Sequence, residues 1–179
     1  VVALARAELV GHRESSVVDL MNQKAAQLGC ANTHFTTPHG LYDPNHYSTA
    51  KDMAVITEYA MTKTAFKEIT SSVSYLPEGF YAPIETTNYM IDPNGHGGSY
   101  YYEYATGVKT GYTDEAGRCL ISTAERNGYH YLCVALGAAY SFVEDINYAM
   151  LDSRSLYTWA FDTLSYQSVY TSIDSVKTV

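Results

Sequence analysis

RCLISTAERNGYHYLCVALG, residues 118–137, predicts two strands joined by a tight turn. The pair Asn127-Gly128 separates two apolar runs, and it is a strong hairpin signal because both residues tolerate the positive φ of a type I′ turn. Such a turn places Arg126 opposite Tyr129 and Ser122 opposite Cys133. One face then carries Cys119, Ile121 and Thr123 against Leu132, Val134 and Leu136, and the other carries Leu120, Ser122 and Ala124 against Tyr131, Cys133 and Ala135.

Both faces of this hairpin are apolar enough to require cover, so we expect flanking helices. The other predicted elements are a helix over residues 1–10, a helix over 15–28, a third over 50–60 that Ser48 can cap, a strand over 104–112 and a closing helix over 151–164. In the second helix Val17, Leu20, Met21, Lys24, Ala25 and Leu28 share a face, and in the last one Leu156, Trp159, Ala160 and Leu164 do. Residues 71–100 are predicted to be irregular or short strands. The residues therefore predict an α/β (α+β) domain with an antiparallel sheet.

Composition excludes several classes of protein. The chain has 179 residues, of which 46% are hydrophobic and 17% charged, so it is globular and not disordered. Its formal charge of −8 offers no broad attraction for phosphate backbones, so nucleic acid is not an expected partner. No apolar stretch is long enough to span a membrane. The three cysteines are too few for a disulfide scaffold, and Cys119 and Cys133, on opposite faces, are expected to be small buried hydrophobes.

Lys109-Thr110-Gly111 is the first candidate for chemistry. On an edge strand, the Lys places charge near a carboxylate or assists proton transfer, the Thr hydroxyl binds the carboxylate, and the Gly lets a substrate backbone approach. Taken alone, the tripeptide is weak evidence for a functional site, because most such triplets are turns or exposed strand ends.

Ser48-Thr49-Ala50-Lys51 fits Ser-x-x-Lys, a spacing that puts a nucleophile and its base on one helix face. The simpler interpretation, which we favour, is that Ser48 caps a helix and Lys51 is solvated.

Two further clusters are expected to be structural. The histidines His34, His39 and His46, with Asp43, match no compact zinc template, so they are expected to form hydrogen bonds within a loop and no metal site is predicted. Asp114 and Glu115 are expected to be solvated turn residues.

In combination, these segments resemble the low-molecular-weight penicillin-binding proteins, which are serine D-alanyl-D-alanine carboxypeptidases. The matching stretches, in the family's order and spacing, are residues 20–25, 28–35, 38–41, 46–54, 87–88 and 107–117. The resemblance extends from Val17 to about Phe161. The resemblance strengthens the assignment of Lys109-Thr110-Gly111 as a functional site, because this tripeptide matches the third of the family's three site motifs.

The resemblance implies a β-lactamase/transpeptidase-like fold that is incomplete at its N-terminus. Residues 1–164 would be the C-terminal part of the peptidase domain, and residues 165–179 the start of a truncated β-rich domain. The sequence contains no Ser-x-Asn motif, and Ser48–Lys51 falls in a different family segment from the nucleophile. Near Ala149 we find no secure equivalent of the Arg that some members carry before the last helix.

The resemblance also implies a function for the parent protein, meaning the gene product that contains this chain. That function is the trimming of D-Ala-D-Ala stem peptides of peptidoglycan through an acyl-enzyme, outside the cytoplasm, with no cofactor and with β-lactams as covalent inhibitors. Lys109 would be catalytic, and Thr110, Gly111 and Tyr112 would bind substrate. The chain by itself is expected to be inactive, and any membrane attachment would come from segments absent here. The alternatives are a non-catalytic muropeptide-binding protein, or a β-lactamase or endopeptidase on the same fold.

Overall fold

The computed structural model describes residues 14–165, with the backbone alone for residues 14–16. The helices are α2 (Glu14–Gln27), α3 (Ala50–Met61), α4 (Thr64–Ser71), the short 3-10 turn η1 (Gly95–Gly98) and α5 (Tyr148–Thr163). The strands are β1 (Ser74–Tyr75), β2 (Ile84–Glu85), β3 (Ala105–Thr113), β4 (Gly117–Arg126), β5 (Tyr129–Ala138), β6 (Tyr140–Ser141) and β7 (Ile146–Asn147). The predicted helix over residues 1–10 and the tail from residue 166 onward lie outside the described residues, and the predicted boundary at residue 164 stays a prediction.

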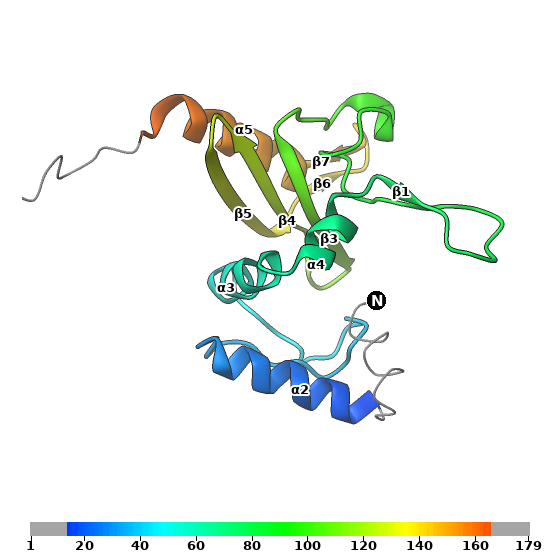
Figure 1. The fold of residues 1–179 in the computed structure, drawn as a ribbon, viewed down its shortest axis with the longest axis vertical. Coiled ribbons are helices and arrows are strands. Elements are labelled where there is room, and N and C mark those ends of the chain that lie inside the picture. The colour runs from blue at the N-terminus through cyan, green and yellow to red at the C-terminus, as the bar shows by residue number, and fades with distance from the viewer. Residues whose placement is uncertain (1–13, 166–179) are drawn as a thin grey trace, which may run out of the picture.

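The predicted hairpin is confirmed as β4 and β5 (Figure 1). Asn127 and Gly128 have φ values of 54° and 79°, as a type I′ turn requires. The pairing follows the predicted register from Arg126↔Tyr129 to Leu120↔Ala135. Beyond Leu120 the prediction of regular pairing is wrong, because the register shifts and Arg118 lies opposite Ala138. This irregularity is a β-bulge.

β3 is an edge strand, because the described sheet has the order β3-β4-β5 and all its pairs are antiparallel. Val108 pairs with Ser122, Thr110 with Leu120 and Tyr112 with Arg118. Since cross-strand partners share a face, Thr110 and Tyr112 lie on one face and Lys109 on the other.

The face of Leu120, Ser122 and Ala124 is buried against α5. Leu120 and Ala124 belong to a core with Met90, Tyr100, Ala149, Met150 and Tyr157. The predicted apolar side of the last helix is confirmed for Ala160, which is buried, and wrong for Leu156, Trp159 and Leu164, which are exposed. The buried side carries Tyr157 as well. Tyr157 is accommodated because its hydroxyl hydrogen-bonds to Ser122 at 2.9 Å inside the core.

The opposite face of the hairpin is half-buried, so the expected cover is present there only in part. α3 lies against β5 and α4 against β3. Leu136 remains exposed. The cysteines Cys30, Cys119 and Cys133 are free thiols; Cys30 is buried, whereas Cys119 and Cys133 are half-buried, contrary to the expected full burial of the last two.

α2 and the connection that follows it form the lower part of the molecule in Figure 1. Asn22 bonds both the carbonyl and the amide of Phe35, each at 2.8 Å, and this ties the connection to the helix. The buried Asp52 accepts bonds from Asn32 N and Thr33 Oγ1. Leu20, which shares the predicted face of α2 with the buried Val17 and Ala25, is half exposed. Within residues 14–165, no helix is both long and apolar enough to cross a membrane.

Candidate functional site

Lys109, Thr110, Gly111 and Tyr112 lie consecutively along the edge strand β3. The β-sheet alternation sends the Lys109 side chain to one face and those of Thr110 and Tyr112 to the other. Gly111 is exposed and offers no side chain that could obstruct an approaching backbone. The geometry therefore presents a cation, a hydroxyl and an open strand edge within one short segment.

Lys109 carries the positive charge of this segment. Its Nζ donates a hydrogen bond to the Thr110 carbonyl oxygen at 2.7 Å, which folds the side chain back along its own strand. Although the side chain keeps contact with solvent, the surrounding protein removes part of its hydration, and this desolvation lowers the pKa of Lys109. A lysine of this kind remains able to attract a carboxylate and releases its proton more readily than a free lysine.

Thr110 is held by a residue that the sequence reasoning did not assign. Its hydroxyl is in hydrogen-bond contact with the hydroxyl of Thr87. Thr87 is itself fixed by Asn88, a buried residue whose backbone N–H bonds to Thr86 Oγ1 at 3.1 Å and whose Oδ1 accepts from Met90 N at 3.2 Å. The pair Thr87-Asn88 contributed to the family resemblance, but nothing in a single sequence places it beside Thr110.

Tyr112 is positioned by a cation–π stack at the end of β3. The Arg118 guanidinium carbon lies 4.2 Å from the centroid of the Tyr112 ring and 4.6 Å from that of Tyr140. The Tyr112 hydroxyl donates to Asp114 Oδ1 at 2.7 Å, and this bond raises the pKa of Tyr112. Asp114, expected to be a solvated turn residue, therefore also orients Tyr112.

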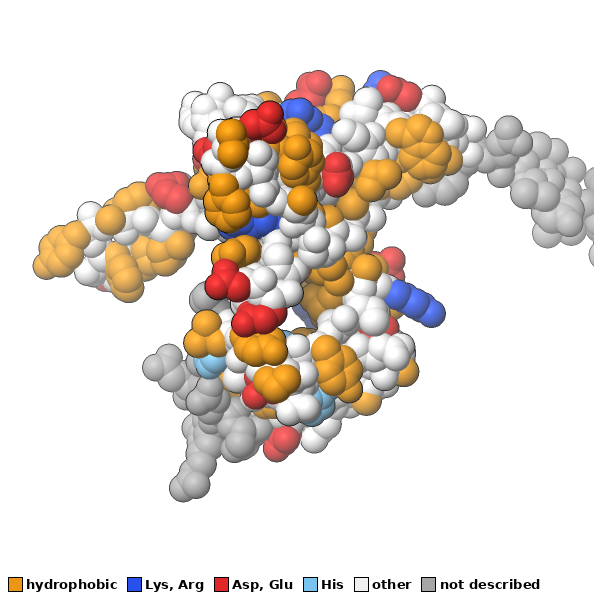
Figure 2. Space-filling view, turned by 180° about the vertical axis from the view of Figure 1, so that it is seen from behind, with side chains coloured by type: hydrophobic (Ala, Val, Ile, Leu, Met, Phe, Trp, Pro, Cys, Tyr) orange, Lys and Arg blue, Asp and Glu red, His pale blue; other side chains and the backbone are white. Residues whose placement is uncertain are grey.

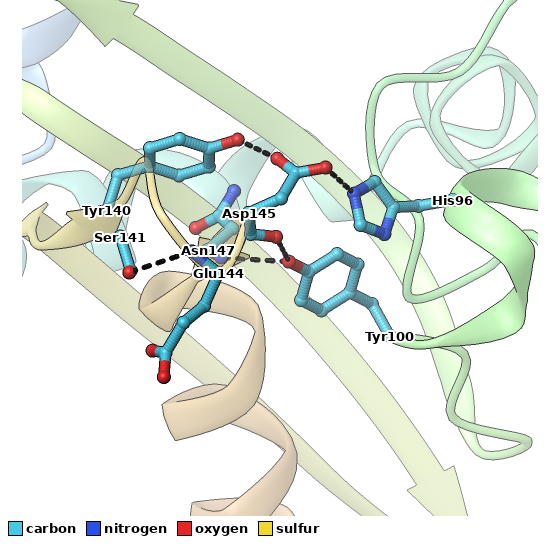
Figure 3. Close-up of polar contacts among 7 residues, drawn as sticks. All are labelled: His96, Tyr100, Tyr140, Ser141, Glu144, Asp145 and Asn147. Carbon is cyan, nitrogen blue, oxygen red and sulfur yellow. Dashed lines mark hydrogen bonds and ion pairs between the residues drawn. The ribbon is translucent and has the colours of Figure 1, made fainter.

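Tyr140 also belongs to a polar network with Asp145, His96, Tyr100 and Asn147 (Figure 3). The Asp145 carboxylate lies between the Tyr140 hydroxyl and His96 Nε2, the latter at 2.8 Å. These two hydrogen bonds lower the pKa of Asp145. The Tyr100 hydroxyl donates to the Asp145 carbonyl and accepts from Asn147 N, so the segment after η1 is linked to the β6–β7 turn.

The hydrogen bonds of Ser48 do not connect the Ser48–Lys51 segment to β3. Both hydrogen bonds of the Ser48 hydroxyl stay in the connection before α3, to Thr33 Oγ1 at 2.9 Å and to the Thr49 carbonyl. Lys51 is exposed, as expected. The prediction that Ser48 caps α3 is wrong by one residue: Thr49 is the N-cap, and its Oγ1 accepts from Asp52 N at 3.1 Å.

The loop histidines form hydrogen bonds, as predicted. His34 Nδ1 bonds the Asn45 carbonyl at 2.6 Å, and His46 Nδ1 accepts from Thr36 N at 3.2 Å. Burial lowers the pKa of His46, which favours the neutral ring that can accept this bond. Among residues 14–165, no group of three or more His, Cys, Asp or Glu side chains is arranged to hold a metal ion.

Comparison with known proteins gives a consistent result. A family model described as D-alanyl-D-alanine carboxypeptidase matches residues 1–140. The D-alanyl-D-alanine carboxypeptidase DacF of Bacillus subtilis is 34% identical over 142 residues, which are 76% of this chain and 34% of that protein. The chain spans about a third of the length of this relative and of two others, the DacA protein of Haemophilus influenzae and the DacC protein of Escherichia coli.

Solved structures share the fold. The D-alanyl-D-alanine carboxypeptidase of Mycobacterium tuberculosis H37Rv superposes with a TM-score of 0.74 at 29% identity, over 91% of this chain and 59% of that one. Penicillin-binding protein D2 of Listeria monocytogenes, in its cefotaxime-bound form, superposes with a TM-score of 0.65 at 30% identity, over 82% of this chain and 56% of that one. The mixed helical and antiparallel fold predicted from the residues is therefore that of penicillin-binding proteins.

Proposed function

The chain belongs to the D-alanyl-D-alanine carboxypeptidase family, and we propose that its parent protein is a serine-type enzyme that removes the terminal D-Ala from peptidoglycan stem peptides. One observation carries this proposal. A Lys, a Thr and a Gly lie in sequence on the edge of the described sheet, with the Thr87 hydroxyl against that of Thr110. This is the arrangement that an extended peptide with a free carboxylate requires.

Each residue of the segment has a proposed role. Lys109 and Thr110 hold the terminal carboxylate of the substrate, and Lys109 assists proton transfer. Gly111 lets the substrate backbone pair with β3, and the backbone N–H groups near Gly111 and Tyr112 polarise the scissile carbonyl. The lowered pKa of Lys109 is compatible with both of its duties, because the charged form binds the carboxylate and the proton is readily exchanged.

The proposed reaction proceeds through an acyl-enzyme and uses neither metal nor cofactor. A serine oxygen forms a bond to the penultimate D-Ala carbonyl carbon, the peptide C–N bond breaks, and the amine of D-Ala leaves with a proton. Water then hydrolyses the ester. β-Lactams would acylate the same serine. Because the only Ser-x-x-Lys of the chain holds its serine against Thr33, the nucleophile is proposed to lie in another segment of the parent protein.

Intact-mass spectrometry with ampicillin tests the proposal. The parent protein is expected to gain one penicilloyl group and to release D-Ala from a stem peptide, whereas this chain alone stays unmodified and inactive. A parent protein that neither takes up ampicillin nor releases D-Ala contradicts the proposal. A penicilloyl adduct on this chain alone would place the nucleophile within it, with Ser48 as the first residue to examine.

A second candidate function, non-catalytic binding of muropeptides, is favoured for the isolated chain. The binding segment of β3 is complete in it, whereas the Ser48 hydroxyl is engaged elsewhere. Retention of a D-Ala-D-Ala peptide by the chain without turnover would support this function. In either case a peptidoglycan ligand implies a location outside the cytoplasm, and fractionation of cells with an antibody to the chain tests this.

A further inference from the structure

A strongly exposed apolar surface of the described chain is a two-stranded arm, residues 74–85, that projects from the body of the molecule (Figures 1 and 2). β1 and β2 pair as Ser74↔Glu85 and Tyr75↔Ile84, and the Thr86 amide donates to the Val73 carbonyl at the base. Large apolar side chains are each more than half exposed along it: Tyr75, Leu76, Phe80, Tyr81 and Ile84. Solvated aromatic and aliphatic groups in one place mark a binding surface.

The two faces of the arm differ in chemistry. Tyr75 and Ile84 are cross-strand partners and share one face, whereas Ser74 and Glu85 share the other, where the Ser74 hydroxyl donates to Glu85 Oε1 at 3.0 Å. At the tip a turn joins Pro77 to Phe80, with Phe80 N bonded to the Pro77 carbonyl at 3.1 Å. The arm therefore combines exposed rings with hydroxyl and carboxylate acceptors.

The charges of the arm oppose binding to a lipid surface and favour a neutral polar ligand. Residues 74–85 contain Glu78 and Glu85 and no Lys or Arg, in a chain with a formal charge of −8. A carboxylate at the tip opposes insertion into a bilayer, and a negative protein is repelled by anionic headgroups. Sugar rings suit this surface, because their C–H groups pack on the electron-rich faces of aromatic rings while carboxylates and hydroxyls bond the sugar hydroxyls.

The arm is also continuous with the candidate site. β2 leads directly into Thr86 and Thr87, and the Thr87 hydroxyl contacts that of Thr110 on β3. A ligand that binds the arm and a peptide that pairs with β3 would therefore be held by one continuous stretch of chain. This is the arrangement that a polymer with both parts, a glycan and a stem peptide, would use.

We propose that the arm binds the glycan strands of peptidoglycan, stacking the sugar rings on Tyr75, Phe80 and Tyr81. The inference rests on the proposed function for the identity of the polymer. Its consequence is a preference for polymeric substrate over short free peptides, because the second contact lowers the rate of dissociation.

Cosedimentation of the whole chain with insoluble peptidoglycan, stripped of its stem peptides by an amidase, tests the proposal. The wild-type chain is expected to bind and to be displaced by a soluble hexamer of N-acetylglucosamine. The variant Tyr75→Ala/Phe80→Ala/Tyr81→Ala should bind about tenfold more weakly or worse. The variant Tyr75→Phe/Tyr81→Phe, which keeps the rings, should retain most of the binding.

A matched control is Phe142→Ala, because Phe142 is another strongly exposed aromatic outside the arm; it should bind like the wild type. Equal binding by the triple alanine variant overturns the inference, provided its circular dichroism matches the wild type. The inference is also overturned if the wild-type chain binds only peptidoglycan that keeps its stem peptides. It is overturned as well if the triple alanine variant loses binding to phosphatidylglycerol vesicles but binds the glycan as the wild type does. Failure of the proposed function has a separate signature: D-Ala release is then absent from the parent protein while glycan binding by the arm persists.

Discussion

The side-chain hydroxyls of Thr87 and Thr110 are in hydrogen-bond contact across 23 residues of sequence. This contact joins the segment that follows β2 to the middle of the edge strand β3. It orients the Thr110 hydroxyl, to which we assign the carboxylate of the substrate. Thr87 is thus a positioning residue whose effect is exerted through Thr110.

Replacing Thr87 by Val should weaken recognition of a carboxylate ligand by the parent protein. The substitution keeps the branched shape and removes one neutral hydrogen bond, which corresponds to about 1 kcal/mol, or roughly a fivefold slower acylation by ampicillin. Thr87→Ser should restore most of the rate. Thr106→Val is the control, because Thr106 also lies on β3 but bonds to Thr123. An acylation rate that Thr87→Val leaves unchanged contradicts this assignment.

As the pH is raised, carboxylate binding should decline at a lower pH than it would with a lysine of ordinary pKa. Desolvation lowers the pKa of Lys109 from its usual 10.5, so the charge is lost as pH rises through a value below 10.5. Affinity for N-acetyl-D-Ala-D-Ala, measured by calorimetry between pH 7 and 10.5, should fall in that window. Lys109→Arg stays charged throughout and should flatten the profile. Parallel profiles for the two proteins would show that another group titrates.

The same shift has a consequence for stability with a defined sign. Between the lowered folded pKa and the unfolded value, the folded chain holds fewer protons than the unfolded chain. The free energy of unfolding should therefore rise slightly with pH across that interval. Urea denaturation of the wild type and Lys109→Met at several pH values measures the difference.

The buried pair Ser122 and Tyr157 should show strong coupling in a double-mutant cycle. Their hydroxyls bond at 2.9 Å, and burial raises the pKa of Tyr157 far above its usual value, so the phenol stays protonated at every ordinary pH. Tyr157→Phe or Ser122→Ala removes this buried hydrogen bond and should cost about 1–3 kcal/mol of unfolding free energy. The double variant should cost less than the sum of the two. Strict additivity in urea melts would contradict the coupling.

Asp145 should titrate below the usual carboxyl range. The Tyr140 hydroxyl and His96 favour its charged form, so the stability it contributes is present above 3.8 and lost as pH falls through the lower folded pKa. Tyr140→Phe should raise this pKa toward 3.8, as measured by NMR of the carboxyl carbon. Phe142→Leu, two residues away, should leave it in place. A value at or above 3.8 in the wild type would show that the network of Figure 3 is absent in solution.

Features set by neighbouring residues were accessible from the sequence. The Asn127-Gly128 turn and the alternation beside it predicted the β4–β5 hairpin and most of its register, because turn geometry fixes which residues face each other. The helix predicted over residues 15–28 is α2, and Gly29, with a φ of 79°, lies just beyond its end. The order of the family motifs indicated the fold to which these elements belong.

Features that join distant residues were not accessible in this way. On α5 the sequence predicted the burial of Ala160 but not that of Tyr157, which is buried through its bond to Ser122 on β4 while Trp159 stays exposed. Nothing local placed Thr87 against Thr110, or Arg118 between the rings of Tyr112 and Tyr140. Periodicity and turn chemistry act over a few residues, whereas the partner of a buried hydroxyl or a guanidinium is settled by chain packing over tens of residues. The hairpin and the Lys-Thr-Gly segment therefore follow from the residues alone, and the surroundings of that segment follow from packing.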